Sequence, residues 1–318
     1  MKLILLGIIK SHMVAFTKLF VHALGSLFIK PFILLKRNKA VITTERAINI
    51  LYICLAYRGD LVLNFPAISA LKRHIPDSKI TCWVRGYNEY LANLNPDIYQ
   101  VIVYDDFRSG GVGIFRELLL KFSHKRFFKR IKENRFDMCI DDSGYAFTAL
   151  VCAFARIPFR IGRNSQGFGF LYHHEFPYDF NAPLIKKRFK LLSPLNISIK
   201  SDSELIPRIN IPLNMREAVL KRAGLDSIKS GYFTVHPYAG WAAKNWNNDK
   251  FACVISEFAG FSGLLPVFIG GPSDKEQISD IVNKISVNTL NLAGTLSLPE
   301  IAALISGAVI HFGVDSIG

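Results

Sequence analysis

The stretch from residue 48 to residue 155 switches repeatedly between short apolar runs and helical spacing. Residues 48–55 (INILYICL) form one continuous apolar run, which is typical of a parallel strand buried on both faces. The runs that predict further strands lie at 80–84, 101–104 and 136–140, and the helical patterns between them at 61–74, 86–94, 113–133 and 145–155. This alternation predicts an α/β sheet whose parallel strands are joined by crossover helices.

The pattern is lost at 193–213, where Pro194, Pro207 and Pro212 interleave with short polar stretches, as at a domain junction. A second α/β series follows, with strands expected at 232–236, 265–269, 289–292 and 308–313 and helices at 214–223, 248–259, 273–285 and 298–307. We therefore expect two Rossmann-like domains with doubly wound parallel sheets, 46–213 and 214–318, after an extension formed by residues 1–45. The chain stops directly after an apolar strand, so we expect the second domain to be truncated.

The extension is apolar, but Lys10, Lys18, His22 and Lys30 interrupt it. It therefore lacks the run of about 18 uncharged apolar residues that a transmembrane helix needs. Within 11–30 the polar residues recur at seven- and four-residue steps, and large apolar side chains fill most of the remaining face. This pattern predicts a basic amphipathic helix suited to an anionic membrane surface. The alternative is an ordinary helix packed on the body of the protein.

Charge supports an anionic partner. The 318 residues carry a formal net charge of +14, and residues 1–50 hold eight Lys and Arg against one acid, Glu45. Such a balance favours nucleic acid, acidic lipid or phosphorylated substrates as partners. Half of the residues are hydrophobic, which excludes a disordered chain. Five cysteines without a CxxC pair exclude a disulfide framework and indicate a cytosolic protein.

Asp60 is the first candidate for chemistry. It follows the strand at 48–55 and begins the next helix, which is where open α/β sheets bind ligands. A carboxylate at this point is able to take a proton from a sugar hydroxyl as a general base, and Gly59 allows a substrate to approach closely. The position also suits an aspartate that caps the N-terminus of the helix. The local sequence taken alone favours this capping role over the catalytic one.

The second candidate is the loop 236–246, which follows the first strand of the second series. It is rich in small residues, and its main-chain N–H groups together with Lys244 would suit a phosphate. Trp241 and Trp246 would either pack on a base or anchor the loop. The chain lacks GxGxxG, GxxxxGK[ST] and Asp-x-Asp, so the usual dinucleotide, P-loop and metal–diphosphate motifs are missing. The basic aromatic stretches 124–130 and 186–190 would be the footprint of a nucleic-acid binder, but solvated helix faces explain them as well.

The order of the motifs resembles glycosyltransferase family 9, the ADP-heptose:lipopolysaccharide heptosyltransferases. The resemblance covers about residues 48–318 and is carried by Arg58-Gly59-Asp60, Pro66-Ala67-Ile68-xx-Leu71-Lys72, Asn95-Pro96-Asp97, Arg160-Ile161-Gly162, His236-Pro237, Lys244-x-Trp246, Gly270-Gly271-Pro272, Asn291-Leu292-Ala293-Gly294 and Asp315-Ser316.

This resemblance implies a GT-B fold, in which two Rossmann-like domains face a cleft. It implies an inverting sugar transfer, with heptose from ADP-heptose the expected sugar and a lipopolysaccharide core or related lipid-linked molecule the acceptor. No cofactor, no essential metal and no nucleic acid would take part. The enzyme would be cytoplasmic and peripheral on the inner face of the plasma membrane.

The same resemblance implies roles for individual residues. Asp60 matches the general base on the acceptor hydroxyl. The residues that match the donor site are Gly240, Lys244, Leu296, Asp315 and Ser316, and Arg58 and Arg160 are candidate contacts to acceptor phosphates. Positive charge and N–H donors on the leaving diphosphate, with one carboxylate on the other side, are what an oxocarbenium-like transition state needs.

The chain also departs from the family. Members usually read Asp-Ser-Gly-Pro followed by histidine, whereas Ile317 follows Ser316 here. Tyr238 replaces a small residue, and the extension is longer than usual. These departures keep open an alternative function, that of a non-catalytic nucleotide-sugar-binding protein or a membrane-associated scaffold with the same fold.

Overall fold

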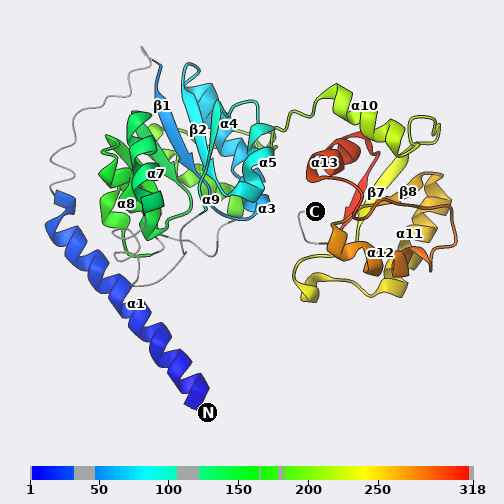
Figure 1. Cartoon of the computed structure of the whole chain (residues 1–318), viewed down its shortest axis with the longest axis horizontal. Coiled ribbons are helices and arrows are strands. Elements are labelled where there is room, and N and C mark those ends of the chain that lie inside the picture. The colour runs from blue at the N-terminus through cyan, green and yellow to red at the C-terminus, as the bar shows by residue number, and fades with distance from the viewer. Residues whose placement is uncertain are drawn as a thin grey trace. The chain divides into compact units, whose positions relative to one another are not determined.

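The computed structural model describes residues 2–31, 47–105, 122–164, 166–177, 181 and 183–314, with the backbone alone for 2–14 and 122–124. The chain divides into two compact units, residues 1–209 and residues 210–318. Each unit contains one parallel sheet with helices on it (Figure 1). The predicted α/β class with parallel sheets is confirmed.

Unit 1 holds a six-stranded sheet in the order β3-β2-β1-β4-β5-β6, and all its strands are parallel. The strands are β1 (Asn49–Ile53), β2 (Lys79–Val84), β3 (Gln100–Val103), β4 (Met138–Asp141), β5 (Phe159–Asn164) and β6 (His174–Pro177). The chain moves outward from β1 to β3 and then returns to place β4 on the other side of β1. The strand order therefore reverses between β1 and β4, which is the switch point where open sheets of this kind bind ligands.

The helices of unit 1 cover both faces of the sheet. They are α3 (Arg58–Val62), α4 (Phe65–His74), α5 (Glu89–Asn93), α7 (Phe122–Glu133), α8 (Ala146–Phe154) and α9 (Leu184–Lys190). Ile50 and Tyr52 of β1 lie in a core with α4 and α9, whereas Leu51 and Ile53 lie in a second core with α7 and α8. Because successive strand residues face opposite sides, the apolar run at 48–55 fills both cores.

Unit 1 adds detail to the sequence pattern. The helical pattern at 61–74, which Pro66 interrupts, forms two helices, α3 and α4, because Pro66 lies in the first turn of α4 and cannot donate a main-chain hydrogen bond to a preceding turn. Strand β5 escaped prediction because its sequence, FRIGRN, contains two arginines, both of which are buried in the fold.

Unit 2 holds a four-stranded parallel sheet in the order β10-β7-β8-β9. Its strands are β7 (Tyr232–His236), β8 (Leu265–Phe268), β9 (Leu290–Asn291) and β10 (His311–Gly313), and its helices are α10 (Leu213–Arg222), α11 (Asn248–Ser262), α12 (Lys275–Val282) and α13 (Leu298–Gly307). These elements lie where the sequence pattern predicts them. Local signals define their ends: Asn247 caps α11 through its side chain, and Gly263 ends that helix with φ 68°.

The extension forms helix α1 (Lys2–Phe28), whose second half packs on unit 1 at the 3₁₀ turn η2 (Gly169–Leu171). Gly25 faces the ring of Phe170 so closely that an added Cβ would lie 2.3 Å from Cδ1. Asn164 Nδ2 donates to His22 Nδ1 at 3.1 Å, and Lys30 Nζ pairs with Glu175 Oε1 at 3.0 Å. One face of α1 is therefore fixed to the sheet by close packing and polar contacts.

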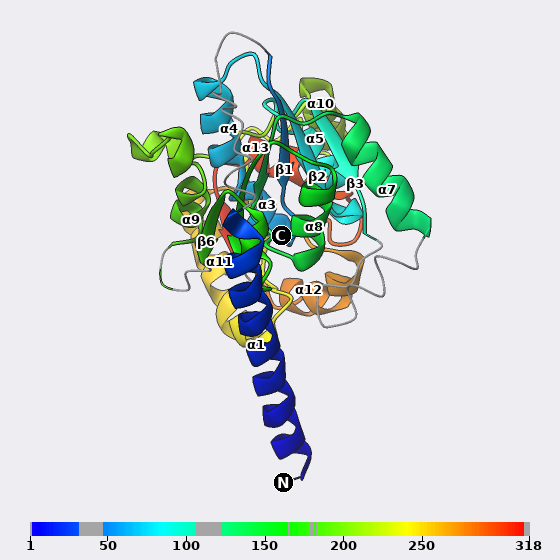
Figure 2. The same ribbon diagram turned by 90° about the vertical axis from the view of Figure 1, so that its left-hand side faces the viewer.

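The opposite face of α1 is apolar and exposed. Its large exposed side chains are Phe16, Leu19, Phe20, Leu24, Leu27 and Phe28. The first turns of the helix project away from unit 1 in both views (Figure 1, Figure 2). Within the described part of the chain, no helix has the length and hydropathy needed to cross a bilayer. One face of the helix therefore packs on the protein, as the alternative considered from sequence expects, and the helix on a membrane surface stays a prediction for the open face.

Replacing Gly25 by leucine should release the second half of α1 from unit 1, because the new side chain overlaps the Phe170 ring. We expect trypsin to cleave after Lys18 about ten times faster, which corresponds to ~1.4 kcal/mol in the opening equilibrium. Ala23→Leu is the matched control, since Ala23 lies on the exposed face of the same helix. Equal cleavage rates in the two variants would refute this packing.

Candidate active site

Asp60 lies in the first turn of the short helix α3, directly after β1. Tyr57 occupies the N-cap of this helix with extended backbone angles, and its side chain makes no capping hydrogen bond. The expectation that Asp60 itself caps the helix is therefore wrong. Its carboxylate does not cap the helix and contacts another part of unit 1 instead.

The Asp60 carboxylate is held by one oxygen. Arg188 Nη2 donates to Asp60 Oδ1 at 2.8 Å, across 128 positions of the sequence. Within the described residues the other oxygen, Oδ2, accepts no hydrogen bond, and the side chain is 29% exposed. A carboxylate with one oxygen fixed and the other accessible has the arrangement that a general base needs.

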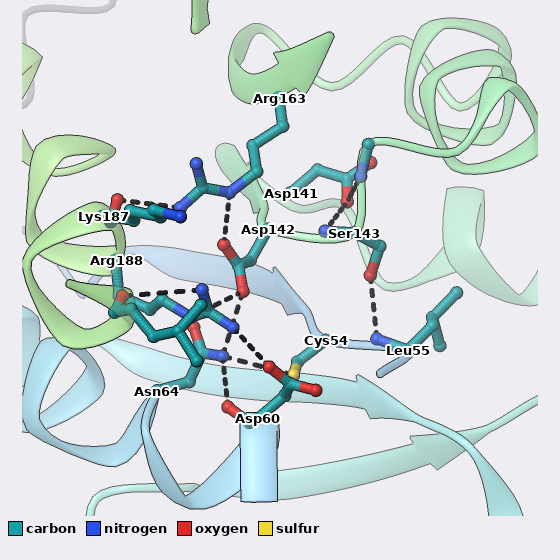
Figure 3. A network of polar contacts seen from close by, with 12 residues as sticks. Cys54, Leu55, Asp60, Asn64, Asp141, Asp142, Ser143, Arg163, Lys187 and Arg188 are labelled. Carbon is teal, nitrogen blue, oxygen red and sulfur yellow. Dashed lines mark hydrogen bonds and ion pairs between the residues drawn. The ribbon is translucent and has the colours of Figure 1, made fainter. Parts of the chain in front are cut away.

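A buried carboxylate lies behind this pair. Asp142 follows β4, and its side chain is 3% exposed. Its Oδ1 accepts a hydrogen bond from Arg163 Nε at 2.5 Å, and its Oδ2 lies 3.1 Å from Arg188 Nε. The four side chains thus form a row of alternating charge, Arg163, Asp142, Arg188 and Asp60, which we call the charge row (Figure 3). Burial opposes the charged guanidinium of Arg188, but the attraction of Asp142, with a further contribution from Asp60, outweighs it and raises the pKa of Arg188.

Asn64 connects the charge row to β1. Its Nδ2 donates to Asp142 Oδ2 at 3.0 Å and to the main-chain oxygen of Asp60 at 2.7 Å. Its Oδ1 accepts from the hydroxyl of Tyr52 at 2.6 Å. A single buried amide therefore ties together the residues that follow β1 and β4, and it fixes α3 beside Asp142.

The neighbouring Asp141 has a separate, structural role. It accepts hydrogen bonds from the main-chain N–H groups of Ser143 and Gly144 and from the hydroxyl of Tyr172. Burial raises the pKa of Asp141 to about 6, against the opposing effect of these hydrogen bonds. Ser143 Oγ in turn accepts from the main-chain N–H of Leu55 at 2.8 Å, which holds the ends of β1 and β4 together.

The two predicted acceptor contacts lie apart from each other. Arg58 is exposed in the same turn as Asp60, and its guanidinium lies 5.5 Å from the centre of the Tyr87 ring. Arg160 is buried, and it donates to the main-chain oxygens of Leu171 and Ile157 at 2.8 and 2.6 Å. Strand alternation turns Arg160 away from the face that Arg163 occupies, so the structure does not bring it together with Asp60.

The predicted donor residues lie in unit 2. Lys244 is exposed in the 3₁₀ turn η5 (Ala242–Lys244) of the loop after β7. The lysine lines an open cavity of about 310 Å³, whose other walls are Trp246, Phe251, Val254, Ile255, Phe312, Gly313 and Val314. The ring of Trp246 meets that of Phe251 edge-on at 6.0 Å, so this tryptophan anchors the loop. Gly240 is exposed, and an added Cβ there would meet open space.

The other donor residues are only partly described. Leu296 is half-buried in the turn before α13, against the core on that side of the sheet. Asp315 and Ser316 lie outside the described residues. The glycine turn after β8 is tightly packed, since an added Cβ at Gly270 would lie 2.6 Å from Ile278 Cδ1. The described loops that carry predicted donor-site residues all follow the carboxyl ends of strands in the second sheet.

The sequence analysis did not identify four residues of the site, namely Asn64, Asp142, Arg163 and Arg188. Asp142 belongs to the Asp-Asp-Ser-Gly that ends a predicted strand, which was a usable signal. Arg188 lies in the basic stretch 186–190, for which a solvated face was expected, yet Lys187 and Arg188 are buried. Among the residues that the structure describes, no three His, Cys, Asp or Glu side chains are placed to hold a metal ion.

Comparison with known proteins decides the family. The family model described as "Glycosyltransferase family 9 (heptosyltransferase)" matches residues 124–317, which is more than half of the chain. The chain belongs to glycosyltransferase family 9. This confirms the resemblance of the sequence motifs, and it makes the protein a glycosyltransferase. Asp60 precedes the matched segment, whereas Arg163 and Arg188 of this family 9 glycosyltransferase lie within it.

Relatives and solved structures agree with this membership. Lipopolysaccharide heptosyltransferase 3 of Escherichia coli K12 is 28% identical over 275 residues, which cover 82% of this chain and 75% of that protein. The glycosyl transferase family 9 structure from Veillonella parvula has a TM-score of 0.69 at 20% identity and covers 84% of this chain and 76% of that one. The ADP-heptose LPS heptosyltransferase II of E. coli has a TM-score of 0.67 at 18% identity, covering 85% and 80%. These two structures confirm the GT-B fold of this family 9 glycosyltransferase.

Removal of the central carboxylate should destabilise unit 1 strongly. Asp142→Asn leaves two buried guanidinium groups without their shared counter-charge, and we expect the free energy of unfolding to fall by about 3–5 kcal/mol. Urea denaturation followed by the fluorescence of Trp83, which is fully buried in unit 1, measures this loss.

The control is Glu204→Gln. Glu204 pairs with Arg73 at 3.8 Å on the surface of the same unit. Its loss should change the free energy by no more than about 1 kcal/mol. If the two variants lost similar stability, Asp142 would not be the counter-charge that the geometry indicates.

Proposed function

We propose that this family 9 glycosyltransferase moves heptose from ADP-heptose to a lipopolysaccharide core or a related lipid-linked acceptor, with inversion and without an essential metal. The observation that carries the proposal is the Asp60 carboxylate at the switch point of the first sheet, with one oxygen held and the other accessible. The heptosyltransferase names of the relatives support the sugar and the acceptor class.

In this proposal Asp60 Oδ2 takes the proton of the acceptor hydroxyl as the hydroxyl oxygen attacks the anomeric carbon. The bond from that carbon to the diphosphate breaks, and ADP leaves with the electron pair. Lys244 in unit 2 supplies positive charge to the diphosphate, with main-chain N–H groups of its loop and of the loop at Asp315 and Ser316. Leu296 borders the adenine, Gly240 lies near the phosphates, and Arg58 reaches an acceptor phosphate.

Asp60→Asn should abolish proton abstraction but leave donor binding intact. The amide still accepts from Arg188, so the local structure is kept, and we expect kcat for ADP release with purified lipopolysaccharide acceptor to fall about 10²–10⁴-fold. The dissociation constant of ADP, measured by calorimetry, should stay within about twofold of the unmodified protein.

Asp77→Asn is the matched control, because Asp77 is an exposed aspartate of the same unit, in the turn that precedes β2. It should transfer sugar normally. Full activity of Asp60→Asn would disprove the assignment of the base. ADP binding by the unmodified protein without any turnover would favour the non-catalytic alternative.

The proposal places the enzyme at the inner face of the plasma membrane, bound to the anionic lipid surface through α1. The exposed face of α1 carries six large apolar side chains, and the segment 1–50 carries the strongest excess of positive charge. Apolar insertion and attraction of lysines to acidic head groups act together in such helices. All five cysteines are free thiols, which fits a reducing cytoplasm.

The double variant Phe20→Glu, Leu27→Glu should lose binding to phosphatidylethanolamine–phosphatidylglycerol vesicles. Each side chain contributes roughly 1.5–3 kcal/mol when it is buried, so co-sedimentation should weaken by more than about tenfold. Phe261→Glu is the control, because Phe261 is 90% exposed in unit 2. Equal loss in the control, or binding to vesicles that does not depend on anionic lipid, would contradict the role of α1.

A further inference from the structure

The contact between Arg188 and Asp60 suggests a role for the arginine in the reaction. We propose that Arg188 is a positioning residue: it fixes the Asp60 carboxylate so that Oδ2 faces the acceptor hydroxyl, and Asp142 and Arg163 hold Arg188 in place. This inference rests on the proposed role of Asp60 as the general base.

Without a partner for its carboxylate, Asp60 would be mobile. Its helix, α3, has only five residues, and its side chain is partly exposed. An aspartate in such a place samples several rotamers. The 2.8 Å hydrogen bond from Arg188 Nη2 to Oδ1 selects one of them and leaves Oδ2 accessible.

Arg188 is itself buried beside a second carboxylate. Its side chain is 6% exposed, and its Nε lies 3.1 Å from Asp142 Oδ2. The same carboxylate is fixed by Arg163, whose Nη2 donates to the main-chain oxygen of Lys187 at 2.8 Å. The residue next to Arg188 in α9 is therefore tied to β5, and the guanidinium reaches Asp60 from a rigid support (Figure 3).

The charges of the row balance one another. A buried guanidinium without a counter-charge is unfavourable. Here Asp142 shares the charge of Arg188, and the two arginines and two aspartates of the charge row are neutral in sum. Arg188 is therefore able to lie buried beside Asp60 without an unpaired charge.

The competing explanation is that the charge row only fastens α9 to the sheet. The two explanations differ in what happens when Asp60 is absent. A positioning residue acts through Asp60, so its replacement should have no further effect once the base is gone. A fastening residue should lower activity by the same factor with or without Asp60.

The test is a double-mutant cycle with Arg188→Met, Asp60→Asn and the combined variant. Rates of ADP release are expressed per ADP-binding site, so that unfolded protein does not count. We expect Arg188→Met to lower kcat about 10- to 100-fold with an unchanged KM for ADP-heptose. In the Asp60→Asn background the same change should alter the residual rate by less than about twofold.

Arg73→Met is the control for loss of an arginine–carboxylate pair in unit 1, and it should keep normal kcat. Arg188→Lys keeps the charge but not the fork that spans both carboxylates, so its kcat should lie between those of the unmodified protein and Arg188→Met. If Arg188→Met does not fold, the cycle is run with Arg188→Lys.

The outcomes separate the two proposals. Equal losses in both backgrounds overturn the positioning role and leave Asp60 as the base. Full activity of Asp60→Asn overturns the proposed base and the positioning role together. A normal kcat in Arg188→Met overturns the positioning role alone.

Discussion

The buried carboxylate of Asp142 is the point on which the arrangement of the first unit's site depends. It receives Arg163 from β5, lies beside Arg188 from α9, and accepts a hydrogen bond from Asn64 next to α4. A lone buried charge would cost several kcal/mol, and a pair of guanidinium groups without a counter-charge would cost more. The three elements therefore meet at the carboxyl edge of the sheet around one carboxylate, and two of their residues, Arg188 and Asn64, also contact Asp60.

This dependence explains how a partly exposed carboxylate on a short helix keeps its place. The five residues of α3 supply little stability of their own, because a helix of this length is marginal in water. Asn64 and Arg188 fix it from behind, through the main-chain oxygen and one carboxylate oxygen of Asp60. The supporting part of the site is buried and charged, and among the described residues one oxygen of the Asp60 carboxylate accepts no hydrogen bond.

The helix α1 is attached to the same unit as Asp60. Its packed face rests on η2 through Gly25, and its open face is lined with large apolar side chains. A glycine in the middle of a helix costs roughly 1 kcal/mol relative to alanine, and here it allows the helix to approach the Phe170 ring. If the open face lies on lipid, the unit that carries Asp60 is the one held at the membrane, where a lipid-linked acceptor is found.

The sequence by itself determined most of the elements, the parallel sheets and the resemblance to the family. Continuous apolar runs are local signals, and Asp60 and Lys244 follow such runs, so their place at strand ends was readable along the chain. The tertiary structure alone decided which charges meet. Asn64 reaches Asp142 across 78 positions and Arg188 reaches Asp60 across 128. Arg160 and Arg163 are three residues apart in β5, yet strand alternation sends one to main-chain oxygens and the other to Asp142. Periodicity predicts which face a residue occupies, but the identity of an ionic partner depends on how distant segments pack.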